Sequence, residues 1–213
     1  MSKVVEKFIA DKFGSQDGAK VTPANLGEPR EFARELGNFL YQLHRLPLET
    51  APAPSFENAF AGQDLIFFEA EFTELLTQYQ KIVPAELLQE QFTRAAKTKW
   101  QKKPVWVLGR FWPENLSVTD GKLTGVKATD QAVSGDPACD LAIAWTLFDE
   151  KARKIFFSAA DTDTQTIDRA RMFALRTALK NYQSQDIDLL IQSRDASTEI
   201  LKDLNYTIAQ DMY

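Results

Sequence analysis

Residues 105–141 read VWVLGRFWPENLSVTDGKLTGVKATDQAVSGDPACDL, and this stretch decides the fold. Its first part, 105–108, is an apolar run that predicts a β-strand followed by a loop. A hairpin comes next, because an Asp120-Gly121 pair separates two short apolar runs. A second loop then leads into a helix. The stretch therefore predicts strand, loop, hairpin, loop and helix in that order.

The strand and its loop, which Pro113 and Asn115 close, resemble the catalytic loop of kinases, where a base Asp precedes a metal-binding Asn by five residues. The resemblance is specific to the aminoglycoside phosphotransferase (APH) family, a branch of the kinase-like fold. That family typically carries V-x-V-H-G-D-L-H-P-G-N-L-L-V, then G-V-I-D-F or G-I-I-D-W, then G-D-P-A-x-D-L-A. This chain has VWVLGRFWPENLSV, GVKAT and GDPACDLA. The matching positions are scaffold positions: Val105, Val107, Gly109, Pro113, Asn115, Leu116, Val118, Gly125, Val126, Gly135, Asp136, Pro137, Ala138, Asp140, Leu141 and Ala142.

The positions that carry the family's chemistry differ. Leu108 stands where the family has His, Arg110 where it has the catalytic Asp, and Ala128 where it has the magnesium-binding Asp. Lys127 adds a cation beside Ala128, and Asn115 is the one polar group of the set that remains. An arginine cannot act as a base at pH 7, and an alanine offers no oxygen to a metal. The resemblance implies ATP and magnesium for the family, whereas these residues predict no catalytic residue, no metal site and neither cofactor here.

Two carboxylates lie close in sequence to the lost ones. Glu114 and Asp130 would restore the chemistry if a register slip brought them into place. The simpler interpretation is that they form local salt bridges with Arg110 and Lys127.

The resemblance also implies structural roles for Asp136 and Asp140. In the family these two residues chiefly bond backbone amides of the catalytic loop and of the helix start. A chain that keeps them after losing the catalytic acids would preserve the fold without the chemistry.

The altered loop has a further interpretation as a binding site. Arg110, Asn115 and Lys127 would converge at one mouth lined by Phe111 and Trp112, which suits an anion or a phosphorylated small molecule. The alternative is an inert, salt-bridged relic. A run of lysines over 97–103 reads as a solvated helix end, with a wider basic mouth as its alternative.

The composition bounds the class of protein. The chain has 213 residues and 44% hydrophobic content, enough for one domain with a real core. Its net charge of -5 argues against a general nucleic-acid binder. One Cys and one His exclude an internal disulfide and make a His/Cys metal centre implausible. No signal-like or membrane-spanning apolar run occurs, so the expected location is the cytoplasm.

Residues 4–13 read as a short extended segment, and 14–29 as a loop rich in Gly, Ser, Asn and Pro. By resemblance, 4–13 would be the hinge between the two kinase lobes. The small N-terminal lobe would then be missing, along with its phosphate-covering loop and Lys–Glu pair. The sequence contains no Gly-rich phosphate loop.

Most of the remaining chain reads as helix, over 30–46, 64–81, 84–99, 139–149, 150–158, 164–184 and 186–204, with a Pro/Ala-rich loop at 47–62. Asp161 and Asp163 offer N-caps for the longest helix. His44, at the end of the first helix, reads as a partly buried structural histidine, and any catalytic His would have to be this one.

These features predict a mainly α fold with a small β-hairpin, a protein-kinase-like C-terminal lobe that lacks the N-terminal lobe. One domain would span 1–213, divided into 1–29 (hinge-like segment and loop), 30–104 (helical), 105–141 (altered catalytic and metal loops) and 142–213 (helical). Apolar groups at 4–13 and on the hairpin would then be exposed and covered by a homodimer or a partner chain. Three functions follow: a non-catalytic binding or regulatory module, an active small-molecule phosphotransferase with relocated residues, or a structural subunit that completes a split kinase-like protein.

Overall fold

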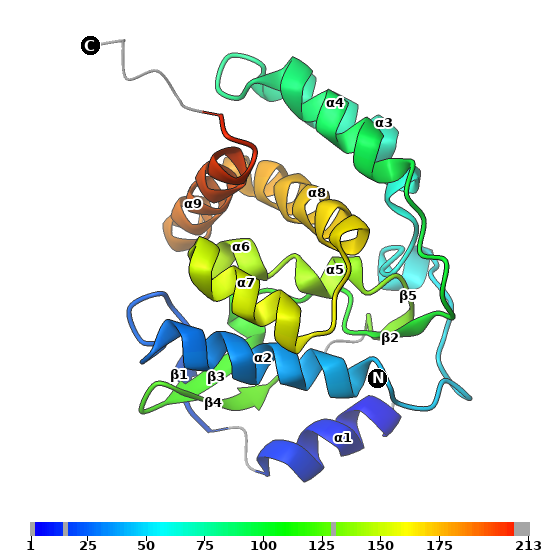
Figure 1. The fold of residues 1–213 in the computed structure, drawn as a ribbon, viewed down its shortest axis with the longest axis vertical. Helices are drawn as coiled ribbons and strands as arrows, with labels where there is room; N and C mark the ends of the chain where they lie inside the picture. The colour runs from blue at the N-terminus through cyan, green and yellow to red at the C-terminus, as the bar shows by residue number, and fades with distance from the viewer. Residues whose placement is uncertain (1–2, 15–16, 129–130, 207–213) are drawn as a thin grey trace.

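The computed structural model describes residues 3–14, 17–128 and 131–206, and the architecture is mainly helical with two small antiparallel sheets (Figure 1). The α-helices are α1 (Lys3–Phe13), α2 (Pro29–Leu43), α3 (Glu69–Tyr79), α4 (Ala85–Ala96), α5 (Ala138–Leu141), α6 (Ala144–Leu147), α7 (Glu150–Ala159), α8 (Thr164–Lys180) and α9 (Ile187–Asp203). Short 3-10 turns are η1 (Phe56–Asn58), η2 (Leu65–Phe68), η3 (Pro113–Asn115) and η4 (Asn181–Gln183). The strands are β1 (Ala19–Lys20), β2 (Val105–Val107), β3 (Leu116–Thr119), β4 (Lys122–Val126) and β5 (Val133–Gly135).

Helix α8 lies at the centre of the helical part, packed against α5, α9, α4 and α3, while α2 runs along α7 (Figure 1). The predicted 30–46 helix is present as α2. Its apolar residues recur every three to four positions and are buried, namely Phe32, Leu36, Phe39, Leu40 and Leu43. The side chain of Glu28 accepts a hydrogen bond from the backbone N–H of Arg30 and so caps the first turn. The predicted N-cap of the longest helix is also present, because Asp163 accepts from the backbone N–H of Thr166.

The predicted hairpin is β3–β4. Asp120 and Gly121 both have positive φ, 51° and 75°, which is the backbone that a two-residue hairpin turn requires. Leu116 pairs with Val126, and a bulge shifts the register after Ser117. Strand β1 joins the other edge of β3, so the predicted 14–29 loop contains a short strand.

The second sheet pairs β2 with β5, which places the loop after β2 next to the GDPACD stretch after β5. Val105 lies opposite Gly135 and Val107 opposite Val133. This pairing positions the candidate site, because the two segments are about thirty residues apart in sequence.

The prediction of an extended segment at 4–13 is wrong, because these residues form helix α1. Val5 and Ile9, one helical turn apart, are buried, and this spacing favours a helix over a strand. The helical spacing therefore describes this segment better than the likeness to a kinase hinge.

The apolar groups expected to be exposed at 4–13 and on the hairpin are also mostly covered. The rings of Phe8 and Phe13 lie 5.5 Å and 5.7 Å from that of Phe39 on α2, and the apolar side chains of the hairpin are buried. Large exposed apolar side chains lie elsewhere, at Phe56, Ile66, Phe67, Ile82, Ile187, Ile191 and Tyr206. No helix within the described ranges has the length and apolar character to cross a membrane.

The predicted helix over 139–149 is divided into α5 and α6. Around Ile143 the backbone hydrogen bonds shorten to three-residue spacing, and the hydroxyl of Thr146 bonds the Ile143 carbonyl at 2.7 Å. Most of the segment is buried.

Candidate functional site

The side chain of Asp140, a fully buried residue of α5, hydrogen-bonds the backbone of the loop after β2. Its carboxylate accepts the backbone N–H of Leu108, at 2.8 Å to Oδ2 and 3.0 Å to Oδ1, and that of Gly109 at 3.0 Å. Gly109 has a φ of 82°, and a Cβ there would lie 2.8 Å from the carbonyl oxygen of Gln131. The start of the loop is therefore fixed by a buried carboxylate and by a glycine that no other residue replaces without strain.

Asp136 is held in a buried ion pair with Arg169 of α8. Oδ2 of Asp136 lies 2.6 Å from Nε of Arg169, and Oδ1 accepts from Nη2 at 3.2 Å and from the backbone N–H of Ala138 at 3.0 Å. The two residues are 3% and 1% exposed. Both oxygens of Asp136 are thus committed to the scaffold.

His44 lies behind the same loop. Its Nε2 is 3.8 Å from Oδ2 of Asp140, too far for a hydrogen bond, and has no hydrogen-bond partner in the described part of the chain. The side chain is 10% exposed.

Arg110 is the residue that the sequence resemblance aligns with the family's catalytic Asp. Its side chain is 70% exposed, and Nη2 lies 3.9 Å from Oε1 of Glu114, so the expected Arg110–Glu114 pair is present. An exposed pair at this distance contributes little to stability and leaves the guanidinium accessible. The expected partner of Lys127, Asp130, lies outside the described residues.

Asn115 is bound into the loop. Its Oδ1 accepts the backbone N–H of Trp112 at 2.9 Å, and its carbonyl oxygen accepts the N–H of Lys127 at 2.7 Å. Ala128 follows Lys127 and packs against the core. The backbone bond between Lys127 and Asn115 therefore brings Ala128 close to Asn115, and the side-chain oxygen of Asn115 is already used by the loop.

These residues do not fit magnesium. The cation prefers carboxylate oxygens, whereas Ala128 provides none, Arg110 is itself a cation, and Asn115, Asp136 and Asp140 are committed to other partners. Among the described residues, no group of three His, Cys, Asp or Glu side chains is placed to hold a metal ion.

A hollow of about 340 Å³ opens beside the loop, and we call it the Arg110 hollow. One wall is the segment 109–114, and the facing wall comes from α8, with Phe173, Arg176 and Lys180. Residues 59–62 form part of a further wall. Asn115 and Lys127 do not line this hollow, so Arg110 is grouped with two cations of α8 that the sequence analysis did not select. Arg176 and Lys180 are four residues apart and so lie on one face of α8, but the sequence does not indicate which segment packs against that face.

The two cations of α8 share the carboxylate of Glu71. Oε1 of Glu71 lies 2.6 Å from Nζ of Lys180, and Arg176 also hydrogen-bonds this carboxylate. Burial alone would raise the pKa of Glu71, but the hydrogen bond from Lys180 and the charge of Arg176 outweigh burial and lower the pKa. Glu71 is therefore ionised and neutralises one of the two cations.

Cys139 also lines the Arg110 hollow. Burial raises the pKa of its thiol well above the usual value, and the charges of Asp140 and Asp136 raise it further. The thiol is thus a packing group rather than a nucleophile.

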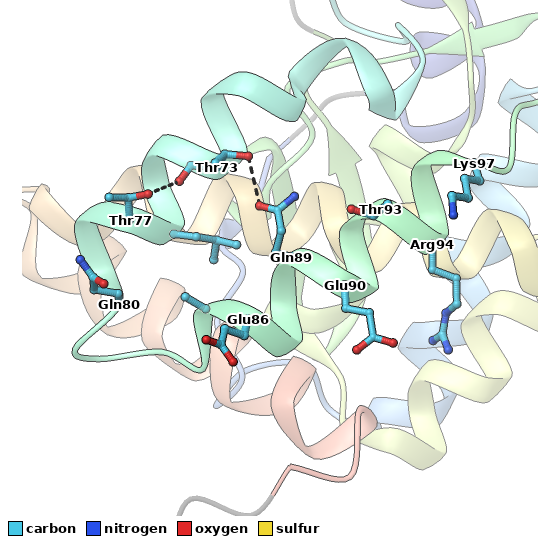
Figure 2. A pocket seen from close by; sticks show the side chains of 11 residues that line it. Thr73, Thr77, Gln80, Glu86, Gln89, Glu90, Thr93, Arg94 and Lys97 are labelled. Atoms are coloured by element: carbon cyan, nitrogen blue, oxygen red, sulfur yellow. Dashed lines mark hydrogen bonds between the residues drawn. The ribbon is translucent and has the colours of Figure 1, made fainter.

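A wider hollow of about 720 Å³ lies between α3 and α4 (Figure 2). Figure 2 shows it lined by uncharged and charged polar side chains of both helices, with Thr73 bonded to Gln89 at 3.1 Å. None of the loop residues discussed above lines it. Mixed charge and polar walls at a helix–helix surface are typical of a solvated groove, so we do not assign a site there.

The family model of the phosphotransferase enzyme family, APH, matches residues 13–174. The chain belongs to this APH family. Solved structures with similar folds include the GDP and kanamycin complex of APH(2")-IIia, at 15% identity and a TM-score of 0.59, aligned over 90% of this chain and 70% of that one. The GDP complex of an aminoglycoside 2'-phosphotransferase is 14% identical with a TM-score of 0.56, over 89% and 69% of the two chains. A macrolide 2'-phosphotransferase type I is 14% identical with a TM-score of 0.52, over 81% and 60%. At these identities the APH structures establish the shared fold alone, and among curated proteins no sequence matches the chain.

Proposed function

We propose that the chain is a non-catalytic APH-family protein that works as a binding or regulatory module. The observation that supports this most is the charge at the loop. Arg110, an accessible cation, stands at the position of the base Asp, and Ala128 stands at the position of the metal Asp. Phosphoryl transfer depends on positioning and on metal-assisted stabilisation of charge, and these two substitutions remove the groups that would provide both.

The remaining acids near the loop support the same proposal. Both carboxylate oxygens of Asp136 accept hydrogen bonds, from Arg169 and from the backbone N–H of Ala138. The carboxylate of Asp140 accepts hydrogen bonds from backbone amides of the loop. Releasing either would expose buried groups without partners, which costs about 3–5 kcal/mol for a broken buried ion pair. These carboxylates are therefore poor substitutes for the missing ones.

An active small-molecule phosphotransferase with relocated residues is the alternative. Glu114 is the described candidate for a relocated base, and its Oε1 lies 3.9 Å from Nη2 of Arg110. Two cations of α8 also face the loop across the hollow. Kanamycin, present in one APH structure, carries several amines, and this excess of cations would disfavour such an acceptor.

Thermal unfolding with ATP, with and without magnesium, separates the two functions. A ligand at 100 times its dissociation constant stabilises a protein by about 2.7 kcal/mol, which is easily measured. We expect no magnesium-dependent shift. A clear shift that requires magnesium favours the enzyme, and a loss of that shift in Glu114→Gln would identify the relocated group.

A homodimer or a partner chain remains part of this proposal, with a structural subunit as the second candidate function. The supporting observation is the set of exposed apolar side chains at Phe56, Ile66 and Phe67, of which Phe56 and Phe67 both lie against the ring of Phe60. Light scattering at micromolar concentration tests the homodimer, and a monomer under those conditions contradicts it. Replacing Phe56 and Phe67 with Ser should then lower the mass of an observed dimer.

A further inference from the structure

We propose that the Arg110 hollow binds a small organic anion, a molecule with a ring or another apolar body that carries one carboxylate or phosphate. This inference rests on the proposed function, because it takes the loop after β2 as a binding element rather than a catalytic one.

The charge of the hollow favours an anion. Arg110, Arg176 and Lys180 line it, and the carboxylates of Glu114 and Glu71 pair with them. Three cations against two carboxylates leave one net positive charge. The pair of Arg110 is the loosest of these, at 3.9 Å with the arginine 70% exposed, so its guanidinium is the group available to a ligand. Guanidinium binds carboxylate and phosphate through two parallel hydrogen bonds.

The walls favour an apolar body on that anion. Phe68, Phe111, Trp112 and Phe173 all line the hollow, and the guanidinium of Arg176 lies 3.9 Å from the centre of the Phe68 ring. Cation and aromatic surface are thus neighbours within one site. The volume of about 340 Å³ lies near the lower end of the range of roughly 300–1,000 Å³ that is usual for small-molecule sites.

The aromatic surface continues outward from the hollow. Ring centres are 5.8 Å apart for Phe173 and Phe68, 5.1 Å for Phe68 and Phe67, and 4.6 Å for Phe67 and Phe60. Phe67 is 49% exposed, so the row runs from the buried wall to solvent. An inorganic anion alone would make no use of this surface, whereas an aromatic or otherwise apolar ligand would.

One polar group of the wall has no partner. Trp112 is 4% exposed, and its indole N–H is buried without a hydrogen-bond acceptor among the described residues. A buried donor without an acceptor costs about 1–3 kcal/mol, so the wall at Trp112 carries an unsatisfied polar group.

Lys127, which the sequence analysis placed in one site with Arg110 and Asn115, provides a control. The side-chain oxygen of Asn115 accepts the backbone N–H of Trp112, and neither Asn115 nor Lys127 lines the hollow. An anion bound in the hollow should therefore depend on Lys180, which lines it with Arg110, and not on Lys127, which does not.

The test uses anilinonaphthalene sulfonate, a fluorescent aromatic anion, and N-phenylnaphthylamine, a similar body without the charge. We expect saturable binding of one sulfonate probe per chain and at least about tenfold weaker binding of the neutral probe. Arg110→Gln and Lys180→Gln should each weaken the sulfonate by about fivefold or more. Lys127→Gln and the distant exposed Arg94→Gln should stay within about twofold of the wild type. Each variant is first checked for an unchanged unfolding curve.

Competition then identifies the anionic group, since benzoate and phenyl phosphate share a ring and differ in the anion. Displacement by either supports the proposal and names the preferred group. Equal binding of the two probes, equal effects of Arg94→Gln and Arg110→Gln, or displacement by neither competitor overturns it. Phosphate transfer from ATP is measured on the same preparations. Transfer would contradict the proposed function alone, whereas absent probe binding with no transfer would contradict this inference alone.

Discussion

Replacing Arg169 with Met should destabilise the protein far more than the same change at Arg110. Asp136 would be left as a buried carboxylate, 3% exposed, with the backbone N–H of Ala138 as its remaining described hydrogen-bond donor. Breaking one side of a buried pair costs about 3–5 kcal/mol. For a domain of this size that corresponds to roughly 6–20 °C in the midpoint of thermal unfolding. Arg110→Met removes an exposed pair at 3.9 Å and should cost at most about 1 kcal/mol.

Urea unfolding followed by far-UV circular dichroism and by tryptophan fluorescence measures both variants, with coincident curves as the check on two-state behaviour. A cycle with Asp136→Asn should give a coupling above about 1.5 kcal/mol between positions 136 and 169. A free energy of unfolding for Arg169→Met within about 1 kcal/mol of the wild type would refute the view that this ion pair holds the loop and α5 in place.

Three further predictions concern single residues. The pKa of Glu71 is lowered in the folded protein, so its stabilising charge is fully present above its ordinary pKa of 4.5 and is lost as the pH falls through the lower folded value. Glu71→Gln should therefore flatten the fall in stability below that pH, and parallel curves for the two proteins would contradict the assignment. Gly109→Ala should cost about 1–3 kcal/mol or more, because a Cβ would meet Ala61 at 2.7 Å, whereas Gly14→Ala, with a φ of 62° and open space, should cost only about 1 kcal/mol. The half-buried thiol of Cys139, whose pKa is raised, should react slowly with a thiol reagent at about pH 8 until urea unfolds the chain, and rapid labelling of the native protein would contradict this.

Local signals in the sequence predicted the parts of the fold that depend on neighbours in the chain. The hairpin followed from Asp120-Gly121, because a two-residue turn demands positive φ at both positions. The amphipathic helices followed from their three-to-four-residue spacing. The bulge after Ser117 and the short strand β1 had no such local signal, since both arise from pairing between segments.

Helix α1 shows how a resemblance can outweigh a better local signal. The spacing of Val5, Phe8 and Ile9 is helical, and two of these residues are buried in the structure. The expected hinge came from the likeness of these residues to the strand between the lobes in related folds, and that likeness does not fix the conformation of the segment.

The site was predictable only in part, because some of its residues are sequence neighbours and others meet only through packing between distant segments. The alignment around Arg110 and Ala128 used sequence neighbours, and the backbone bond from Lys127 to Asn115 brings the segments of Asn115 and Ala128 together. The partners of the loop on α8 were not predictable, because the face of α8 that meets the loop is set by packing between distant segments. Arg169 and Arg176 read as ordinary polar residues on an amphipathic helix until that packing is known.

The most direct measurement is phosphate transfer from radiolabelled ATP by the purified chain, with magnesium present, to water and to a panel of amino and hydroxyl acceptors. We expect no transfer above a blank without protein, because the resemblance to the APH family aligns Arg110 and Ala128 with the base and the metal ligand. Transfer that requires magnesium and disappears in Glu114→Gln would contradict it.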